Sequence, residues 1–391
     1  MEIKQSDALK RLPEQFFSKW NGRIKQLEAS GYDVINLGQG SPDLPTDERI
    51  TDALRHAALD PVNHQYPPYR GFAYFKKGIV HFYRRKFNIE LNDETEVAIL
   101  FGSRIGIFHV VKALLNPGDY ALLPDPGYPD YLSSIRLADA RFDVMPLAQE
   151  NRFLPDYDNI PIEQAKRAKL MFINYPNNPT GAVASLPFFE KTVDFAKRND
   201  IFVVHDFAYE AICYDGKKHP SFLEAEGAKE IGIELYSMSK TFNMAGWRVG
   251  FAVGNEAVIE MINKLQDHLF ISLFGGIQYA ATEALLGSQP FVDRLVKTYE
   301  QRRNTFINHL QKIGWNVDPP QGTFFAWLKV PDGYSSEQFT NMLLEKAHVA
   351  VASGDWFGEH GEGYIRVGLL APEERLVEAV HRIAKLNLFN K

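Results

Sequence analysis

Residues 234–253 read ELYSMSKTFNMAGWRVGFAV, and this stretch decides the fold. Its two ends, residues 234–237 and 249–253, are short apolar runs of the kind that form buried strands. Lys240 follows two serines at the end of the first run, and Arg248 precedes the second. Because functional groups in open α/β sheets gather where strands end, the stretch predicts a site at a sheet edge.

The residues before this stretch repeat the same alternation of short apolar runs with amphipathic segments of helix length. Further strands are predicted over residues 97–101, 120–123, 141–146, 170–174 and 201–205. Helices are predicted over residues 105–115, 128–137 and 186–198. This alternation predicts an α/β fold, with a mostly parallel sheet sandwiched by helices.

The last hundred residues differ in pattern. One long helical stretch is predicted over residues 255–286 and another from 290 to 313, and strand-like segments follow at 323–328 and 363–368. Helices mixed with short strands predict a smaller α+β domain. The first forty residues are helical and then extended, so we expect them to pack with this C-terminal part. The expected division is a large domain of residues 45–285 and a small domain of residues 1–44 and 286–391.

Composition narrows the class of protein. The 391 residues carry a formal charge of −6 with no long run of one sign, which argues against nucleic acid or an anionic membrane as partner. Cys213 is the single cysteine and the first 20 residues lack a secretory apolar stretch, so a cytoplasmic location is expected. No apolar run reaches the roughly 18 residues of a membrane span. Without a His-Glu-x-x-His pair or a cysteine cluster, no metal site is expected.

Lys240 is the first candidate for chemistry. The sequence lacks the common nucleotide-binding glycine motifs and the G-x-S-x-G motif, and the S-x-x-K pattern at 237–240 lacks its S-D-N and K-T-G partners. A lysine beside hydroxyls and a second cation suits a Schiff base next to an anion site. The alternative is a solvated lysine at the start of a helix.

Four other strand ends carry candidate residues. Asp206 could hold a cofactor's ring nitrogen protonated, although it could also be a helix N-cap. Asn178 lies in a loop stiffened by proline and glycine, which could aim its amide at a ring hydroxyl. Ser103 lies at a predicted helix N-terminus, where phosphate binds. Tyr128 could stack on a flat ring.

Together these segments resemble a known family. The set N-x-P-x-N-P-T-G at 174–181, D-x-x-Y at 206–209 and S-x-S-K at 237–240, with G-x-R-x-G at 246–250, resembles the fold type I pyridoxal-phosphate-dependent aminotransferases of class I/II. The resemblance extends from about residue 34 to residue 370. Residues 12–17, 36–43 and 125–130 look nearest to the diaminopimelate-type and methionine-salvage (methylthio-oxobutanoate) aminotransferases.

The resemblance implies a role for each candidate residue. Lys240 would form the Schiff base with pyridoxal 5'-phosphate and later move the proton, and Asp206 would pair with the pyridine nitrogen. Asn178 and Tyr209 would bind the ring oxygen, and Tyr128 would cover the ring. The phosphate would be held by Ser103, the backbone of Arg104, Ser237, Ser239 and Arg248.

Substrate and partner contacts are implied in the same way. Gly40 and Arg366 would bind the substrate α-carboxylate, the arginine through a planar two-point contact. Tyr66 matches a tyrosine that reaches the phosphate across a dimer interface, which implies a homodimer with shared active sites. The small-molecule partners would be an amino acid and a 2-oxo acid.

Substrate choice is predicted from residues outside the cofactor set. Ile105 stands where diaminopimelate-type members carry an acidic residue, and no second arginine is visibly placed for a distal carboxylate. The candidate walls are apolar: Phe16, Phe17, Ile105, Phe270, Leu273 and Phe274. We therefore expect apolar or thioether substrates such as methionine, with 4-methylthio-2-oxobutanoate as the acceptor implied by the resemblance.

Two alternatives remain open at this stage. Another fold type I reaction, such as C–S lysis, decarboxylation or diaminopimelate transamination, would use the same cofactor frame. A regulator that keeps the frame as a ligand-binding module would add a DNA-binding domain with a basic face, and the negative net charge argues against this.

Overall fold

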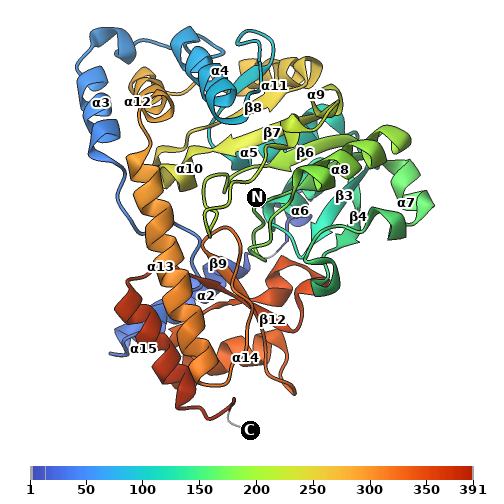
Figure 1. Ribbon diagram of the computed structural model, residues 1–391. Coiled ribbons are helices and arrows are strands. Elements are labelled where there is room, and N and C mark those ends of the chain that lie inside the picture. Colours follow the sequence, from blue (N-terminus) through green and yellow to red (C-terminus); the bar gives the residue numbers. More distant parts are fainter. Residues whose placement is uncertain (1–2, 14, 390–391) are drawn as a thin grey trace.

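The computed structural model describes residues 3–13 and 15–389, and its centre is a seven-stranded sheet (Figure 1). The strand order is β2–β8–β7–β6–β5–β3–β4. Their bounds are β2 (Val97–Leu100), β3 (Tyr120–Asp125), β4 (Arg141–Pro146), β5 (Ala168–Ile173), β6 (Phe202–Asp206), β7 (Gly232–Ser237) and β8 (Gly250–Gly254). Every pairing is parallel except the two made by β8. The prediction of a mostly parallel sheet is confirmed.

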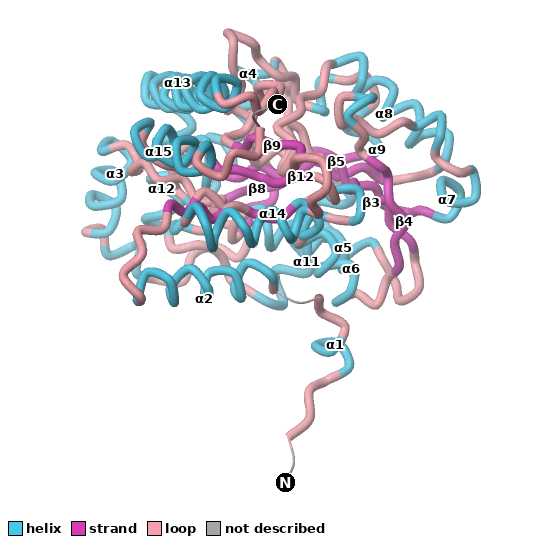
Figure 2. The backbone as a smooth tube through the Cα atoms, turned by 90° about the horizontal axis from the view of Figure 1, so that it is seen from below, coloured by secondary structure: helices cyan, strands magenta, loops and turns pink. Residues whose placement is uncertain are grey.

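Helices cover both faces of this sheet because its strands are apolar on both sides (Figure 2). Leu170 and Phe172 of β5 pack into one core cluster, while Met171 and Ile173 pack into the other. One face carries α5 (Ser103–Leu114), α6 (Asp130–Leu137) and α11 (Glu256–Leu269). The other carries α3 (Glu48–Ala58), α4 (Ala73–Phe87), α8 (Leu186–Asn199) and α12 (Gly275–Leu286).

The strand directions bring the candidate residues to one edge. Since β8 is antiparallel to both β2 and β7, the carboxyl ends of β2, β7, β6, β5 and β3 meet at the same edge, where β8 begins. Short helices continue the chain around the sheet: α7 (Ile162–Arg167), α9 (Ala228–Ile231) and α10 (Met238–Thr241). The loops that follow these strand ends therefore converge.

A second cluster of structure contains the C-terminal residues (lower part of Figure 1). Its antiparallel sheet has the order β11–β12–β9, formed by β9 (Phe325–Lys329), β11 (Ala352–Ser353) and β12 (Tyr364–Gly368). The helices are α13 (Pro290–Lys312), α14 (Ser336–Met342) and α15 (Glu373–Ala384), and α14 continues directly into a π-helix over Leu343–Ala347. A separate apolar core joins them.

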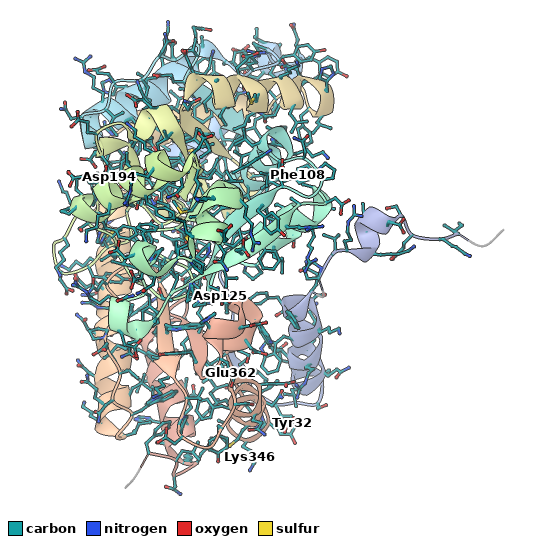
Figure 3. All side chains as sticks on the ribbon, turned by 90° about the vertical axis from the view of Figure 1, so that its right-hand side faces the viewer. Tyr32, Phe108, Asp125, Asp194, Lys346 and Glu362 are labelled. Carbon is teal, nitrogen blue, oxygen red and sulfur yellow. The ribbon has the colours of Figure 1, made fainter. Side chains whose placement is uncertain are left out.

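Both chain ends contribute to this part. Strand β1 (Ile35–Asn36) pairs in parallel with β10 (Val349–Ala350), and Trp20 of α2 (Phe16–Ala29) packs with Leu344. Helix α1 (Asp7–Lys10) projects from the body on the N-terminal segment (Figure 3). Residues 1–2, 14 and 390–391 of the expected small domain lie outside the described residues.

One sequence prediction about helices is wrong. The single helical stretch expected over residues 255–286 is interrupted between α11 and α12, where Phe270 has an extended backbone. The carbonyl of Leu273, which no longer belongs to a helix, accepts a hydrogen bond of 2.6 Å from Gln278 Nε2. The Phe274 ring lies 6.1 Å from His64, so this interruption packs against the loop before α4. No helix among residues 3–13 and 15–389 has the length and apolar character required to cross a membrane.

Candidate active site

A cavity of about 560 Å³ lies at the converging strand ends and reaches the C-terminal part of the chain. Nearly all the predicted site residues line it: Gly40, Ser103, Arg104, Tyr128, Asn178, Asp206, Tyr209, Ser237, Ser239, Lys240, Arg248 and Arg366. Tyr66 does not line it; its side chain is 86% exposed. The structure thus brings together twelve residues drawn from distant parts of the sequence.

Lys240 lies in α10, the short helix that follows β7. Ser237 caps this helix by accepting a hydrogen bond of 3.2 Å from the Ser239 N–H. Lys240 Nζ donates a hydrogen bond of 2.6 Å to the Gly40 carbonyl. Burial, together with the charges of Arg366 and Arg248, lowers the pKa of Lys240 to about 8. A fraction of this amine is therefore neutral and nucleophilic near neutral pH.

Asp206 ends β6 with one oxygen engaged and the other without a partner. Oδ2 accepts a hydrogen bond of 2.9 Å from the Tyr131 hydroxyl, whereas the buried Oδ1 has no hydrogen-bond partner among the described residues. Asn174 Nδ2 donates to the Asp206 carbonyl at 2.7 Å and holds the backbone. Burial raises the pKa of Asp206 to about 6. A buried acceptor of this kind is suited to a ligand N–H group.

Arg366 is a buried cation whose hydrogen bonds go to neutral groups. Its Nη1 donates to Asn178 Oδ1 at 2.8 Å and its Nη2 donates to the Gly38 carbonyl at 3.1 Å. The Arg366 guanidinium carbon lies 4.0 Å from the centre of the Phe325 ring. Within residues 3–13 and 15–389 no ion pair involves Arg366, and Nε is unpartnered. A buried charge left uncompensated by the protein is a site for a ligand anion.

A second anion site is built from small residues and an arginine. Gly102 has a φ of +82°, and a Cβ placed there would lie 2.5 Å from Arg248 Nη2, so only glycine fits. Ser103 begins α5 and lines the cavity, so the free N–H groups of the first helical turn lie beside the cavity. Ser237 and Ser239 line the same cavity. Hydroxyls, free N–H groups and a guanidinium form a donor set suited to phosphate.

The walls near the chain's N-terminus are aromatic. Phe16 and Phe17 of α2 line the cavity, as does Ile105. Phe16 stacks on Trp356 with ring centres 6.1 Å apart, and Phe17 meets Trp356 edge-on at 5.4 Å. These three predicted wall residues therefore do face the cavity.

The other expected wall residues do not. Leu273 is only 3% exposed and packs in the large core, so its assignment to the cavity wall is wrong. Phe270 and Phe274 are partly exposed and do not line this cavity. Phe270 lies one layer behind the wall, since its ring packs on the cavity residue Phe101 with centres 4.9 Å apart.

The expectation that no second arginine is placed for a distal carboxylate stays a prediction, since the Arg104 side chain is already paired. Arg104 lines the cavity, and its Nε donates to Asp130 Oδ2 at 2.6 Å. This ion pair joins the start of α5 to the start of α6. Because Asp130 neutralises Arg104, the pair presents polar groups to the cavity with little net charge.

Several residues at or beside the cavity are not among those predicted from the sequence. Asn174 belongs to the quoted N-x-P-x-N-P-T-G segment, so that motif could have signalled its role. Tyr131 of α6 does not line the cavity, but it donates a hydrogen bond to Asp206, which does, and none of the quoted motifs contains it. Trp356 and Phe325 come from the C-terminal part and carry no such signal.

The donor set fits pyridoxal phosphate. The unpartnered Asp206 Oδ1 matches the ring N–H, the Gly102–Arg248 cradle matches the phosphate, and the Lys240 amine matches the aldehyde. Arg366 remains for a carboxylate. Among the described residues, no group of three or more His, Cys, Asp or Glu side chains could hold a metal ion.

Comparisons with known proteins agree with this geometry. The model of the family "Aminotransferase class I and II" matches residues 32–383. The L-glutamine–4-(methylsulfanyl)-2-oxobutanoate aminotransferase of Bacillus subtilis is 57% identical over 100% of this chain and 98% of its own length. The LL-diaminopimelate aminotransferase of Desulforudis audaxviator is 44% identical over 98% of each chain.

A solved structure shows the same fold. The substrate-bound structure of BacF from Bacillus subtilis superimposes with a TM-score of 0.96 at 48% identity, covering 100% of this chain and 99% of that one. The fold prediction is confirmed, as is the prediction of a pyridoxal-phosphate-dependent transaminase. The chain therefore belongs to the class I and II aminotransferases, the fold type I enzymes that use pyridoxal phosphate.

Proposed function

We propose that this aminotransferase moves the amino group of glutamine, or of another amino acid of similar length, to 4-methylsulfanyl-2-oxobutanoate and so forms methionine. The observation that carries the proposal is the set of residues that line one cavity. Lys240 and Arg366 lie at its reacting end, and Phe16, Phe17 and Trp356 form an aromatic wall. The relative named for these two substrates supports the choice.

The side-chain end of the cavity accounts for both substrates. Methionine and glutamine have the same two methylene groups before a thioether or an amide. Each methylene buried against aromatic rings is worth about 0.8 kcal/mol. The neutral Arg104–Asp130 pair offers one donor and one acceptor, which suits an amide better than a second charge. Burial of an unpaired distal charge would be costly, which disfavours aspartate and diaminopimelate.

The cofactor would be held by residues from five strand ends. Asp206 would accept from the ring nitrogen, and Tyr128 would cover the ring. Because Asn178 Oδ1 already accepts from Arg366, its amide nitrogen is the group left to donate to a ring oxygen, with Tyr209 as second donor. The phosphate contacts would come from Ser103, the Arg104 N–H, Ser237, Ser239 and Arg248. When bound, the cofactor supplies an aldehyde and an electron sink.

Lys240 would attach the cofactor and then act on the substrate. After the substrate amine has displaced Lys240, the free Lys240 amine, with a pKa lowered to about 8, would take the proton from the substrate α-carbon. It would then donate this proton to the carbon of the cofactor that carried the aldehyde. Arg366 would fix the α-carboxylate, and Gly40 leaves it room, since a Cβ there would lie 3.8 Å from Arg366 Nη2. With the carboxylate held, the α-proton stays within reach of Lys240.

We also propose that the enzyme is a homodimer and that Tyr66 serves the partner's site. Tyr66 is 86% exposed, and the segment of chain around it carries other large exposed apolar side chains: Leu59, Val62 and Tyr69. Apolar exposure concentrated on one segment marks a protein interface. Because Tyr66 does not line the cavity of its own chain, the Tyr66 side chain of a partner copy would complete the phosphate site.

The domain division and location remain proposals as well. Residues 45–285 would form the large domain and residues 1–44 with 286–391 the small one, which the β1–β10 pairing and the two separate core clusters support. The buried, unpaired Cys213 suits a reducing compartment such as the cytoplasm.

The test is a direct assay of amino transfer. Purified enzyme with pyridoxal phosphate is given glutamine and 4-methylsulfanyl-2-oxobutanoate, and methionine is measured against glutamine consumed. We expect one methionine for each glutamine lost. In a parallel reaction methionine is supplied alone; release of ammonia and a thiol there, with no amino transfer in the first reaction, would support C–S lysis and contradict the proposal.

A further inference from the structure

Tyr131 is buried directly beside the carboxylate of Asp206. Its hydroxyl donates a hydrogen bond of 2.9 Å to Asp206 Oδ2, and the two side chains are 1% and 4% exposed. The Tyr131 ring stacks on Phe172 of β5 with centres 4.8 Å apart and meets the Tyr128 ring edge-on at 5.7 Å. Contacts on two sides fix the direction of the hydroxyl.

This hydrogen bond makes the two carboxylate oxygens of Asp206 different from each other. With Oδ2 engaged by Tyr131, Oδ1 is the oxygen left without a partner among the described residues. Asp206 lines the cavity, whereas Tyr131 does not. The hydroxyl therefore acts from behind the carboxylate, on the side away from the cavity.

The same contact bears on the charge of Asp206. Burial raises the pKa of this carboxyl to about 6, while the Tyr131 hydrogen bond opposes the rise. Burial and the neighbouring Asp206 charge hold the pKa of Tyr131 well above its ordinary value, so the phenol stays protonated as the donor. The other titratable groups around Asp206 are His205 on the same strand, Lys240 on α10 and Tyr209 in the loop after β6.

We propose that Tyr131 is a positioning residue of the active site, whose hydroxyl keeps Asp206 ionised and turns Oδ1 toward the ring nitrogen of pyridoxal phosphate. The inference rests on the role proposed for Asp206. It adds a function for α6: the first turn of this helix places Tyr131 behind the carboxylate, while Tyr128, just before the helix, lines the cavity.

The competing explanation is core packing, in which the hydroxyl merely finds an acceptor. A matched control separates the two, because Tyr83 donates a hydrogen bond of the same length, 2.9 Å, to the buried Glu234, and neither residue lines the cavity. Tyr131→Phe and Tyr83→Phe each remove one buried hydroxyl from a carboxylate. A purely structural role predicts that both variants lose thermal stability and that neither changes Asp206.

The experiment measures the titration of Asp206 in protein freed of cofactor. Aspartate carboxyl carbons are labelled with ¹³C, and the Asp206 signal is assigned by its loss in Asp206→Asn. We expect the acid dissociation constant of Asp206 to fall about tenfold in Tyr131→Phe, because a hydrogen bond to the charged form is lost. Affinity for pyridoxal phosphate at pH 7 should fall in the same variant, and Tyr83→Phe should leave both quantities unchanged.

An unchanged Asp206 pKa in Tyr131→Phe would overturn the inference, as would an equal change in Tyr83→Phe. A second measurement uses the wild-type sequence with 3-fluorotyrosine, whose more acidic hydroxyl donates a stronger hydrogen bond. The pKa of Asp206 should then fall, and an unchanged value would count against the role of Tyr131. Since no substrate is present, these results are independent of which amino acids the enzyme transfers.

Discussion

Arg366 of β12 donates a hydrogen bond of 2.8 Å to Oδ1 of Asn178, which follows β5 in the central sheet. The contact joins residues 188 positions apart and links the group proposed to hold the substrate with a group proposed to hold the cofactor. It also orients the Asn178 amide, because the oxygen faces the arginine. With the proposed roles, binding of the substrate carboxylate at Arg366 would be coupled to the ring-oxygen contact of Asn178.

Arg366→Lys should raise KM for every amino acid substrate by roughly 10- to 100-fold, because a lysine cannot make the two-point contact with a carboxylate. Steady-state kinetics with several substrates measures the effect. Arg303→Lys is the matched control, since Arg303 is also buried but pairs with Asp215 outside the cavity lining. Equal KM values for the Arg366 variant and the wild type would rule out the carboxylate role.

The rate at which cofactor-free enzyme captures pyridoxal phosphate should rise with pH and reach half its maximum near pH 8. The reason is that the neutral amine is the nucleophile, and the pKa of Lys240 is lowered to about 8 by burial, so the amine is protonated below this pH and free above it. Visible absorbance of the lysine-bound cofactor follows the reaction. Lys240→Ala should show neither this absorbance nor turnover while remaining folded. A rate that rises only toward the ordinary lysine value of 10.5 would contradict the lowered pKa.

Asp206→Asn should retain the cofactor yet lose orders of magnitude in the rate of α-proton removal, because a neutral amide cannot hold the ring nitrogen protonated. Single-turnover kinetics with α-deuterated substrate isolates this step. Asp125→Asn provides a comparison, since Asp125 is a buried aspartate at the end of β3 that lies outside the cavity lining, at the boundary with the C-terminal part (Figure 3). If both variants removed the proton at the same rate, Asp206 would have no electronic role.

A Tyr66→Phe subunit mixed with a Lys240→Ala subunit should form hybrid dimers with activity above that of either parent. One site of the hybrid would carry both defects and the other would carry neither, provided that Tyr66 acts across the interface. Activity is measured after unfolding and refolding the mixture, with each parent treated alike. Hybrids no more active than the parents would place Tyr66 in its own subunit's site.

Most of the sheet could be predicted from the sequence because parallel strands buried on both faces are continuous apolar runs. The strands from β2 to β8 lie within about two residues of their predicted ranges. The helical interruption at Phe270 was missed, although residues 270–276 (FISLFGG) contain weak helix formers and two glycines that could have indicated it.

The cavity was predictable where residues belong to family motifs and unpredictable where they do not. Lys240, Asp206 and Asn178 follow strand ends, and motif spacing predicts that they meet. Trp356 gives no local signal, because its place over Phe16 depends on how the two chain ends fold together. Tyr131 looks in the sequence like any core aromatic, and only the structure shows that its hydroxyl meets Asp206.

The central claim is that one cavity combines a transaminase centre with an apolar pocket for the side chain. The most direct test compares kcat/KM for methionine, phenylalanine, aspartate and diaminopimelate with a common 2-oxo acid acceptor. The aromatic wall of Phe16, Phe17 and Trp356, together with the neutralised Arg104, predicts that methionine exceeds both charged substrates. Aspartate or diaminopimelate ahead of methionine would contradict the account.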